Sequence, residues 1–277
     1  MQSRQAAMPK RGRMVLRSVD DDVPSKVFDQ RLADLEALIP VWSRNFAAPL
    51  MEAVGRDLQS GGLASGALIL DVGTGAGYPA LDLQARYPSL RVEALEAWEP
   101  AVARARDRGV AAFHGDLLTW SGGLYDAVVA NVCLNVIDDR AAAARALARL
   151  LRPGGRLYAT VTLRGTLRAL DRAVERICSA RNVLERMQAH RFTVVTLRAA
   201  FAGGAFADVA VDVGRFTLNY ESGEAMATSA PIRMGYAHRY REIVGDSGWR
   251  RLIEVLDRER GIALDVPFAL LTATRSP

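Results

Sequence analysis

One segment rich in glycine carries the clearest sign of chemistry in this sequence. Residues 67–78 read Ala-Leu-Ile-Leu-Asp-Val-Gly-Thr-Gly-Ala-Gly-Tyr, an apolar run that ends in an acid and continues with glycines at alternate positions. The apolar run is typical of a strand buried on both faces of a parallel sheet, and the glycines leave room for a ligand beside the backbone. Dinucleotide sites have a third glycine where this chain has Tyr78, so the spacing disfavours NAD and FAD. The segment therefore predicts a strand that leads into the binding loop of a different cofactor.

Polar side chains follow the next predicted strands. The second strand ends at Glu96, 25 residues after Asp71, and its two acceptor oxygens could hold both hydroxyls of a ribose. A short third strand leads into Asp116, and a fourth strand ends in Asn131. In open α/β sheets, ligands bind at the carboxyl ends of the strands. These residues are therefore candidates for one shared site.

In this order, the segments resemble the class I S-adenosylmethionine (SAM)-dependent methyltransferases. The run Asp71-x-Gly73-x-Gly75-x-Gly77 is similar to the first motif of that family, and the segment 150–156 resembles its helix-to-strand turn before strand five. Five such matches fall in order between residues 67 and 163. The resemblance implies that SAM and its product S-adenosylhomocysteine (SAH) are bound by the following residues: Asp71, Gly73, Thr74, Gly75, Gly77, Glu96, Ala97, Asp116, Leu117 and Asn131.

The resemblance also implies separate roles for three acids. Glu96 would hold the ribose, Asp116 the adenine amino group, and Asp71 would support the amino group of the cofactor. Asp116 has a structural alternative as a solvated loop acid or a helix cap. We also expect Asp71 to hydrogen-bond backbone amides of its own loop.

The order of the elements and the resemblance imply an α/β fold with a doubly wound, mostly parallel seven-stranded sheet, the Rossmann-like methyltransferase fold. We expect an N-terminal helical cap, a helical insert after strand five, and a last strand antiparallel to the others. Strand six is expected at 206–216 and strand seven at 267–274. The expected regions are a flexible basic tail at 1–22, the helical cap at 23–60, and a SAM-binding domain at 61–277 with substrate-lid insertions at about 165–192 and 220–245.

A helical stripe of apolar residues precedes the first strand. Apolar residues keep helical spacing over 28–39 and again over 42–54, so we expect two amphipathic helices that are broken at Pro40. In many resembling small-molecule enzymes, such a helix pair folds across the cofactor. Trp42 and Phe46 are then candidates for the wall of a substrate pocket, and their alternative role is that of core residues.

The loop after the fourth strand departs from many members of the family. They carry a histidine where this chain has Asn135, so a histidine base from this loop is excluded. Enzymes that methylate exocyclic amines of nucleic-acid bases use an Asn/Asp-Pro-Pro-aromatic sequence at this place. The segment 131–134, Asn-Val-Cys-Leu, has neither prolines nor an aromatic residue, which argues against that chemistry.

Three residues in the second expected insertion are candidates for proton removal. Tyr236, His238 and Tyr240 lie close together in the sequence, in a region that corresponds by order to the acceptor-pocket insert of the resembling enzymes. Histidine suits a general base because its unperturbed pKa is near ~6.5. If the segment is helical, the two tyrosines share one face and His238 points elsewhere, so all three cannot serve one substrate atom. The alternative is a surface histidine beside two tyrosines at the edge of the core.

The composition narrows the range of partners. The formal net charge is +5 and the pI is near 9.5, but almost all the positive charge is arginine, so the basic balance is weak evidence for nucleic acid. The two cysteines and three histidines show no disulfide or metal-ligand spacing, so we expect free thiols and no metal. No apolar run approaches the ~20 residues of a membrane span, and no signal-type run follows Met1. We therefore expect a cytoplasmic protein.

Together these features predict a SAM-dependent methyltransferase with a small organic acceptor, such as a secondary metabolite or a quinone-like molecule. The order of elements looks most like the ubiquinone/menaquinone C-methyltransferase type and related natural-product tailoring enzymes. Methylation of oxygen, nitrogen or carbon stays open, as does a homodimer. Two alternatives are an enzyme that binds SAM without methyl transfer, such as a cyclase, and an RNA methyltransferase that uses the basic tail.

Overall fold

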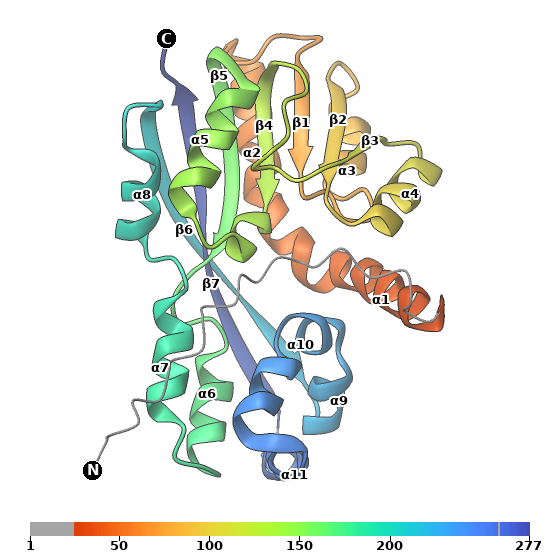
Figure 1. Ribbon diagram of the computed structural model, residues 1–277, viewed down its shortest axis with the longest axis vertical. Helices are drawn as coiled ribbons and strands as arrows, with labels where there is room; N and C mark the ends of the chain where they lie inside the picture. The colour runs from red at the N-terminus through yellow and green to blue at the C-terminus, as the bar shows by residue number, and fades with distance from the viewer. Residues whose placement is uncertain (1–24, 260) are drawn as a thin grey trace, which may run out of the picture.

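Seven strands form one sheet in the computed structural model, which describes residues 25–259 and 261–277 (Figure 1). The order across the sheet is β3-β2-β1-β4-β5-β7-β6. The strands are β1 Leu68–Val72, β2 Arg91–Glu96, β3 Ala111–His114, β4 Tyr125–Asn131, β5 Leu151–Thr162, β6 Phe206–Tyr220 and β7 Ile262–Arg275. The first five pair in parallel, whereas β7 runs antiparallel to both β5 and β6. The predicted sheet with an antiparallel last strand is thus confirmed, and the tail expected at 1–22 lies outside the described residues.

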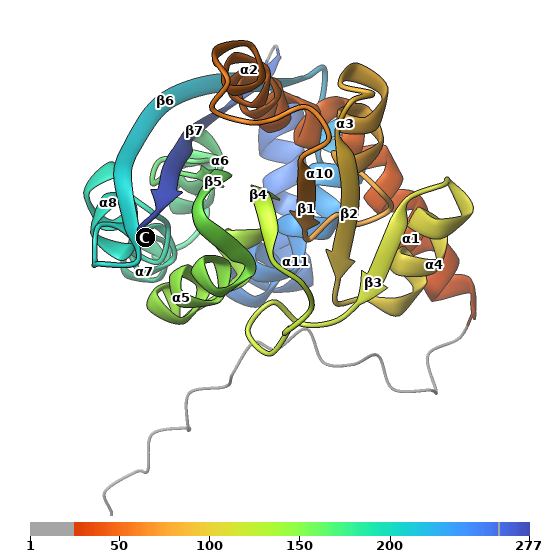
Figure 2. The same ribbon diagram turned by 90° about the horizontal axis from the view of Figure 1, so that it is seen from above.

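Helices cover both faces of the sheet (Figure 2). On one face lie α2 Arg44–Ser60, α3 Ala80–Arg86 and α4 Glu99–Asp107, and on the other lie α5 Arg140–Leu150 and α8 Val194–Phe201. Neighbouring strand residues face opposite layers: Ile69 and Val129 pack in the first layer, and Leu70 and Val128 in the second. The central strands are apolar on both sides because both faces are covered.

Residues 25–60 are helical throughout, which corrects the break expected at Pro40. Helix α1 Ser25–Leu38 passes into a five-residue π-helical segment, Ile39–Ser43, and then into α2. The Arg44 N–H donates to the carbonyl of Ile39, which is the i→i−5 bond of a π-turn. Because Pro40 has no N–H, one helical bond is lost there, and the wider turn absorbs this loss without ending the helix.

Strands β6 and β7 extend beyond the rest of the sheet as a two-stranded ribbon. They pair along their whole length, whereas β5 pairs only with residues 268–274 of β7. Both strands are longer than the expected 206–216 and 267–274, because Leu218, Leu264 and Val266 pack on helices that the sequence pattern alone does not place beside them. Pro267 lies where β5 has ended, so its missing N–H removes no hydrogen bond to that strand.

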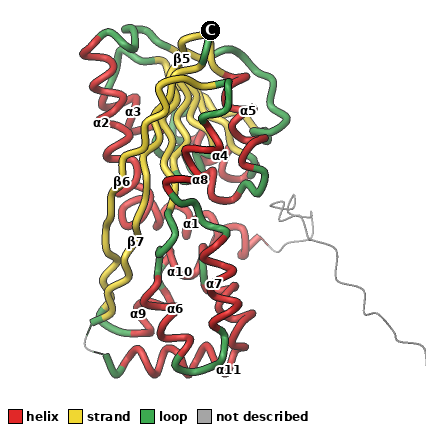
Figure 3. Tube along the Cα trace, turned by 90° about the vertical axis from the view of Figure 1, so that its left-hand side faces the viewer, coloured by secondary structure: helices red, strands yellow, loops and turns green. Residues whose placement is uncertain are grey.

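A helical lobe is built around this ribbon (Figures 1 and 3). It consists of α6 Arg168–Glu175, α7 Arg181–Ala189, α9 Gly223–Thr228, α10 Ala230–Gly235 and α11 Ala237–Asp257, with a kink in α11 at Gly245. We call these helices and the ribbon the ribbon lobe. The insertions expected at about 165–192 and 220–245 are thus helical, and the second one continues to Asp257. Within the described ranges, no helix combines the length and apolarity needed to cross a membrane.

Candidate active site

The glycine loop between β1 and α3 has a backbone that only small residues allow. Gly73 has a φ of +73° and Gly75 a φ of +56°, a region that residues with side chains rarely adopt. A Cβ atom on Gly73 would lie 2.4 Å from the Cβ of Cys133, so the loop after β4 closes against this position. A Cβ atom on Gly75 would lie 3.4 Å from the side chain of Leu35. Helix α1 therefore reaches the glycine loop.

Asp71 lies near the end of β1 and is fully buried. Its Oδ2 accepts from the N–H of Ala80, the first residue of α3, at 3.0 Å, whereas its buried Oδ1 and the buried hydroxyl of Thr74 have no hydrogen-bond partner among the described residues. Burial, with a smaller contribution from the charge of Glu96, raises the pKa of Asp71 from 3.8 to about 7, although the nearby Thr74 hydroxyl and the N–H of Ala80 act in the opposite direction. A cationic donor at Oδ1 would satisfy this oxygen and stabilise its ionised form. The α-ammonium group of SAM is such a donor, so the residues present fit the cofactor.

Glu96, at the end of β2, organises the glycine loop opposite it. Its Oε2 accepts from the N–H of Gly75 at 2.9 Å, and its Oε1 accepts from the N–H of Trp98 at 2.9 Å. A carboxylate oxygen can accept a second hydrogen bond, so the capacity for ribose hydroxyls remains. Removal of this carboxylate would therefore affect the loop as well as the ligand.

The other predicted cofactor residues at this edge have different environments. Asp116 is exposed, and its Oδ1 accepts from the N–H of Leu118 at 2.7 Å within a turn; no helix follows it directly, so its alternative role is that of a loop acid and not of a helix cap. Leu117 packs in the core at 6% exposure. Ala97 is exposed, and its carbonyl oxygen lies 3.1 Å from Nε2 of His114. All of these residues gather at the carboxyl ends of β2 and β3, beside Glu96.

Two asparagine side chains tie the loop after β4 to neighbouring elements. Asn131 accepts from the hydroxyl of Thr160 at 2.8 Å and donates to the carbonyl of Ser43 at 3.2 Å. Asn135 donates to Oγ1 of Thr162 at 2.8 Å and accepts from its N–H at 2.9 Å. Both side chains thus make structural hydrogen bonds, and the contact with Ser43 fixes the N-terminal helices against β4.

Helix α1 crosses the carboxyl edge of the sheet and is held on two sides (Figure 1). Glu36 forms an ion pair with Arg104 of α4 at 3.0 Å, and the buried Asp34 forms an ion pair with Arg233 of α10. Leu35, between the two acids in the sequence, approaches the glycine loop. Helix α1 therefore connects the cofactor edge to the ribbon lobe.

The two candidates for the wall of a substrate pocket lie in an aromatic cluster. Trp42 makes T-shaped contacts with Phe46, Phe216 and Tyr236, at centroid distances of 5.1, 5.7 and 5.9 Å. Trp42 is 8% exposed and Phe46 is fully buried, so both belong to the core of the ribbon lobe. Their role against a substrate stays a prediction.

The three candidates for proton removal do not meet at one point. Tyr236 precedes α11 and lies in the aromatic cluster. Tyr240 is fully buried and donates to Oδ1 of Asp171 at 2.8 Å, and burial together with this carboxylate raises its pKa well above the usual value. His238 is exposed, and partial desolvation of the ring together with the charge of Arg239 lowers its pKa. Catalytic roles for these residues stay predictions.

No sequence motif marks Arg191, yet the structure places it beside the aromatic cluster. Its guanidinium carbon lies 5.3 Å from the centroid of the Tyr236 ring, and its Nε is buried without a hydrogen-bond partner among the described residues. In the sequence it is one arginine among many in an arginine-rich chain. Only the fold distinguishes it from the others.

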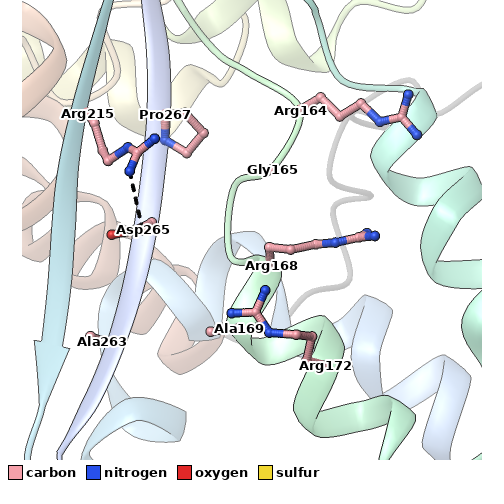
Figure 4. Close-up of a pocket in the computed structure, with 9 residues that line it drawn as sticks. All are labelled: Arg164, Gly165, Arg168, Ala169, Arg172, Arg215, Ala263, Asp265 and Pro267. Carbon is pink, nitrogen blue, oxygen red and sulfur yellow. Dashed lines mark ion pairs between the residues drawn. The ribbon is translucent and has the colours of Figure 1, made fainter.

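A cavity of about 270 Å³ opens elsewhere, between the ribbon and the segment that leads into α6 (Figure 4). Figure 4 shows the side chains of Arg164 and Arg168 pointing away from the strands, and both form ion pairs with Glu185 of α7. Arg215 forms an ion pair with Asp265 at 3.8 Å. Neighbouring carboxylates thus balance most of this positive charge, and none of the predicted site residues lines the cavity.

Comparison with known sequences finds methyltransferases. A family profile described as a methyltransferase domain matches residues 70–159. A malonyl-[acyl-carrier protein] O-methyltransferase from Laribacter hongkongensis is 28% identical over 214 residues, which cover 70% of each chain. One from Xylella fastidiosa is 32% identical over 113 residues, which cover 38% of each chain.

Solved structures share the fold. Phosphoethanolamine N-methyltransferase 2 of Haemonchus contortus, in complex with SAM, has a TM-score of 0.56 and 16% identity over 92% of this chain and 60% of that one. The YcgJ protein of Bacillus subtilis has a TM-score of 0.54 and 16% identity over 82% of this chain and 99% of that one. The matched methyltransferase domain and the similarity to these methyltransferases, together with the sheet order and the glycine loop, support a class I SAM-dependent methyltransferase.

Proposed function

We propose that the enzyme transfers the methyl group of SAM to an oxygen of a small organic acid. The observation that carries this proposal is the chemistry of three described residues at the end of β4 and in the loop that follows it. Asn131 and Asn135 make structural hydrogen bonds, and burial raises the pKa of the Cys133 thiol, which keeps it protonated. None of these three side chains can remove a proton at neutral pH. An acceptor that is already ionised needs no such base.

A carboxylate acceptor fits this environment because it is ionised at neutral pH. SAM supplies an electrophilic methyl carbon bonded to a sulfonium. A carboxylate oxygen forms a bond to that carbon while the carbon–sulfur bond breaks, which gives a methyl ester and SAH without proton transfer. The protein then acts mainly by orientation, which can contribute ~7–11 kcal/mol. A general base would add only ~10²- to 10⁴-fold.

Three acids would hold the cofactor in this proposal. Oδ1 of Asp71 would accept from the α-ammonium group, since it is buried and has no other partner among the described residues. Glu96 would accept from the ribose hydroxyls with its remaining lone pairs, and Asp116 would contact the adenine. The acceptor would approach from the side of the ribbon lobe, where Ser43 and Trp42 lie next to the end of β4.

The curated relatives support oxygen as the methylated atom. Both are named as O-methyltransferases of malonyl-[acyl-carrier protein], and the Laribacter protein matches over 70% of its length. A malonyl thioester carries one free carboxylate. Malonyl thioesters are therefore candidate acceptors for this enzyme, beside free organic acids.

The proposal can be tested by mass spectrometry with SAM that is isotopically labelled in its methyl group. Malonyl-coenzyme A, malonate and benzoate would be compared with a phenol, a quinol and a primary amine. We expect labelled methyl esters and an equal amount of SAH from at least one acid. Methylation of only the phenol, quinol or amine would refute the acid as acceptor. Tight SAM binding with no methylated product from a broad panel would favour an enzyme that uses the cofactor without methyl transfer.

A further inference from the structure

Arg191 lies at the same edge of the sheet as the cofactor residues. It follows α7, and the next residue, Phe192, forms a bridge with Leu163 directly after β5. The Phe192 carbonyl also accepts from the N–H of Arg164 at 2.8 Å. The backbone at Arg191 is therefore fastened beside the carboxyl end of β5, and β5 is the neighbour of β4.

From this position, Arg191 is linked to the end of β4 by consecutive contacts. Its guanidinium carbon lies 5.3 Å from the ring centroid of Tyr236, and Tyr236 contacts Trp42. Ser43 follows Trp42 in the sequence, and its carbonyl accepts from the side chain of Asn131, the last residue of β4, at 3.2 Å. The loop after β4 lies against the glycine loop, because Cys133 packs directly on Gly73. Arg191 thus lies on the side from which an acceptor would reach the cofactor.

Arg191 is half-buried, and one of its donors lacks a partner among the described residues. Its Nε is buried and has no partner. The charge of Arg191 acts on the buried Asp171, but that carboxylate takes its hydrogen bonds from Tyr240 at 2.8 Å and Gln188 at 2.7 Å. Asp171 also forms an ion pair with Arg168 at 3.7 Å. A buried N–H without a hydrogen-bond partner costs free energy, which an anionic ligand bound to the guanidinium would recover.

We propose that the guanidinium of Arg191 binds the carboxylate of an acidic acceptor beside the rings of Tyr236 and Trp42. This inference rests on the proposed function and names the substrate contact that it requires. A guanidinium presents its N–H groups as a planar fork that matches the two oxygens of a carboxylate, and such bonds are strong away from bulk water. In this role Arg191 selects and orients the acid and takes no part in proton transfer.

The test compares Arg191→Met and Arg191→Lys with a control, Arg198→Met, in the full-length protein saturated with SAH. Arg198 is exposed on α8, so the control removes one nearby positive charge outside the site. Calorimetry would measure the binding of malonate, with the uncharged dimethyl malonate as comparison. We expect Arg191→Met to bind malonate about 10-fold or more weakly, Arg191→Lys to lose part of the affinity, and Arg198→Met to match the wild type. Affinity for SAH should stay unchanged in all variants.

The proposal would be overturned if Arg191→Met and the wild type bound malonate with equal affinity. It would also be overturned if Arg198→Met lost as much malonate affinity as Arg191→Met, or if the wild type did not bind malonate. A loss of SAH affinity and thermal stability in both Arg191 variants would assign the residue to the support of the lobe and would also overturn it. Malonate binding that depends on Arg191 without methylation of any acid would support the anion site and refute the proposed O-methylation. Methylation of acids with a KM that is the same in Arg191→Met and the wild type would support the proposed O-methylation and refute the anion site at Arg191.

Discussion

Replacement of Asp71 by asparagine should stabilise the cofactor-free protein at high pH and weaken its binding of SAH. The carboxylate is fully buried, and only one of its oxygens has a partner, the N–H of Ala80 at 3.0 Å. Asparagine has nearly the same shape and keeps an oxygen that can accept from Ala80. It carries no charge, so it removes both the cost of burying a carboxylate and the attraction for a cationic ligand.

The size of the effect follows from the pKa of Asp71. One pKa unit corresponds to ~1.36 kcal/mol, so the rise from 3.8 to about 7 penalises the ionised form by about 4 kcal/mol. The folded protein keeps this proton up to a higher pH than the unfolded chain does. The free energy of unfolding of the wild type should therefore fall as the pH rises from about 4 to about 7, and the full penalty applies above this range.

Urea denaturation of wild type and Asp71→Asn at several pH values measures this effect. The free energy of unfolding of the variant, minus that of the wild type, should rise by about 4 kcal/mol between pH 4 and pH 8. If the N–H groups of the new amide lack acceptors, they lower the free energy of unfolding of the variant by ~1–3 kcal/mol, and this decrease is the same at every pH. A difference that stays constant with pH would refute the reasoning, because it would mean that Asp71 is ionised without cost.

Ligand binding provides the second half of the same test. SAH has an α-ammonium group, whereas 5′-methylthioadenosine keeps the nucleoside and lacks the amino-acid part. Hydrogen bonds to charged groups contribute ~1.5–3 kcal/mol, so Asp71→Asn should bind SAH ~10- to 100-fold more weakly and 5′-methylthioadenosine almost as well as the wild type. An equal loss for both ligands would show that Asp71 acts only by holding the loop to α3.

Three further variants test other parts of the site. Glu96→Ala should weaken SAH binding by ~1–3 kcal/mol, since it removes acceptors from the ribose and from the N–H of Gly75, and unchanged affinity in calorimetry would exclude its assigned role. Trp42→Phe should lower turnover more than SAH affinity if the cluster orients the acceptor; wild-type turnover with wild-type stability would leave Trp42 as a core residue only. His238→Ala should keep single-turnover rates within about threefold of wild type, because the ring is exposed and the proposed acceptor is already ionised. A loss of ~10²-fold would indicate that His238 acts as a base.

The sheet, and the position of the candidate cofactor acids at one edge of it, could be predicted because their signals are local. An apolar run followed by a polar residue or glycines marks each of these strand ends, and parallel strands bring the ends to one edge. Asp71, Glu96 and Asn131 could therefore be grouped from the sequence. The fold class, the family and the antiparallel last strand are confirmed. The ribbon beyond residue 216 could not be predicted, because its apolar residues pack only on helices distant in the sequence.

Contacts between segments that are distant in the sequence could not be predicted. Asp34 and Arg233 are separated by 199 positions, and nothing in their local patterns marks them as partners. The contact between Arg191 and Tyr236 has the same character. Pro40 indicated a local disturbance correctly, but whether a proline ends a helix or sits in a π-turn depends on what the following helix packs against.

Helix α1 contacts the cofactor loop through Leu35 and the ribbon lobe through Asp34, and this double attachment has a thermodynamic consequence. A ligand on either side that favours the attached position of α1 lowers the free-energy cost of ordering α1 when the other ligand binds. By linkage, cofactor and acceptor must then raise each other's affinity by the same factor. If SAH leaves past α1, this attachment has to be released first, and escape of the product would then set the rate of turnover in place of the methyl transfer.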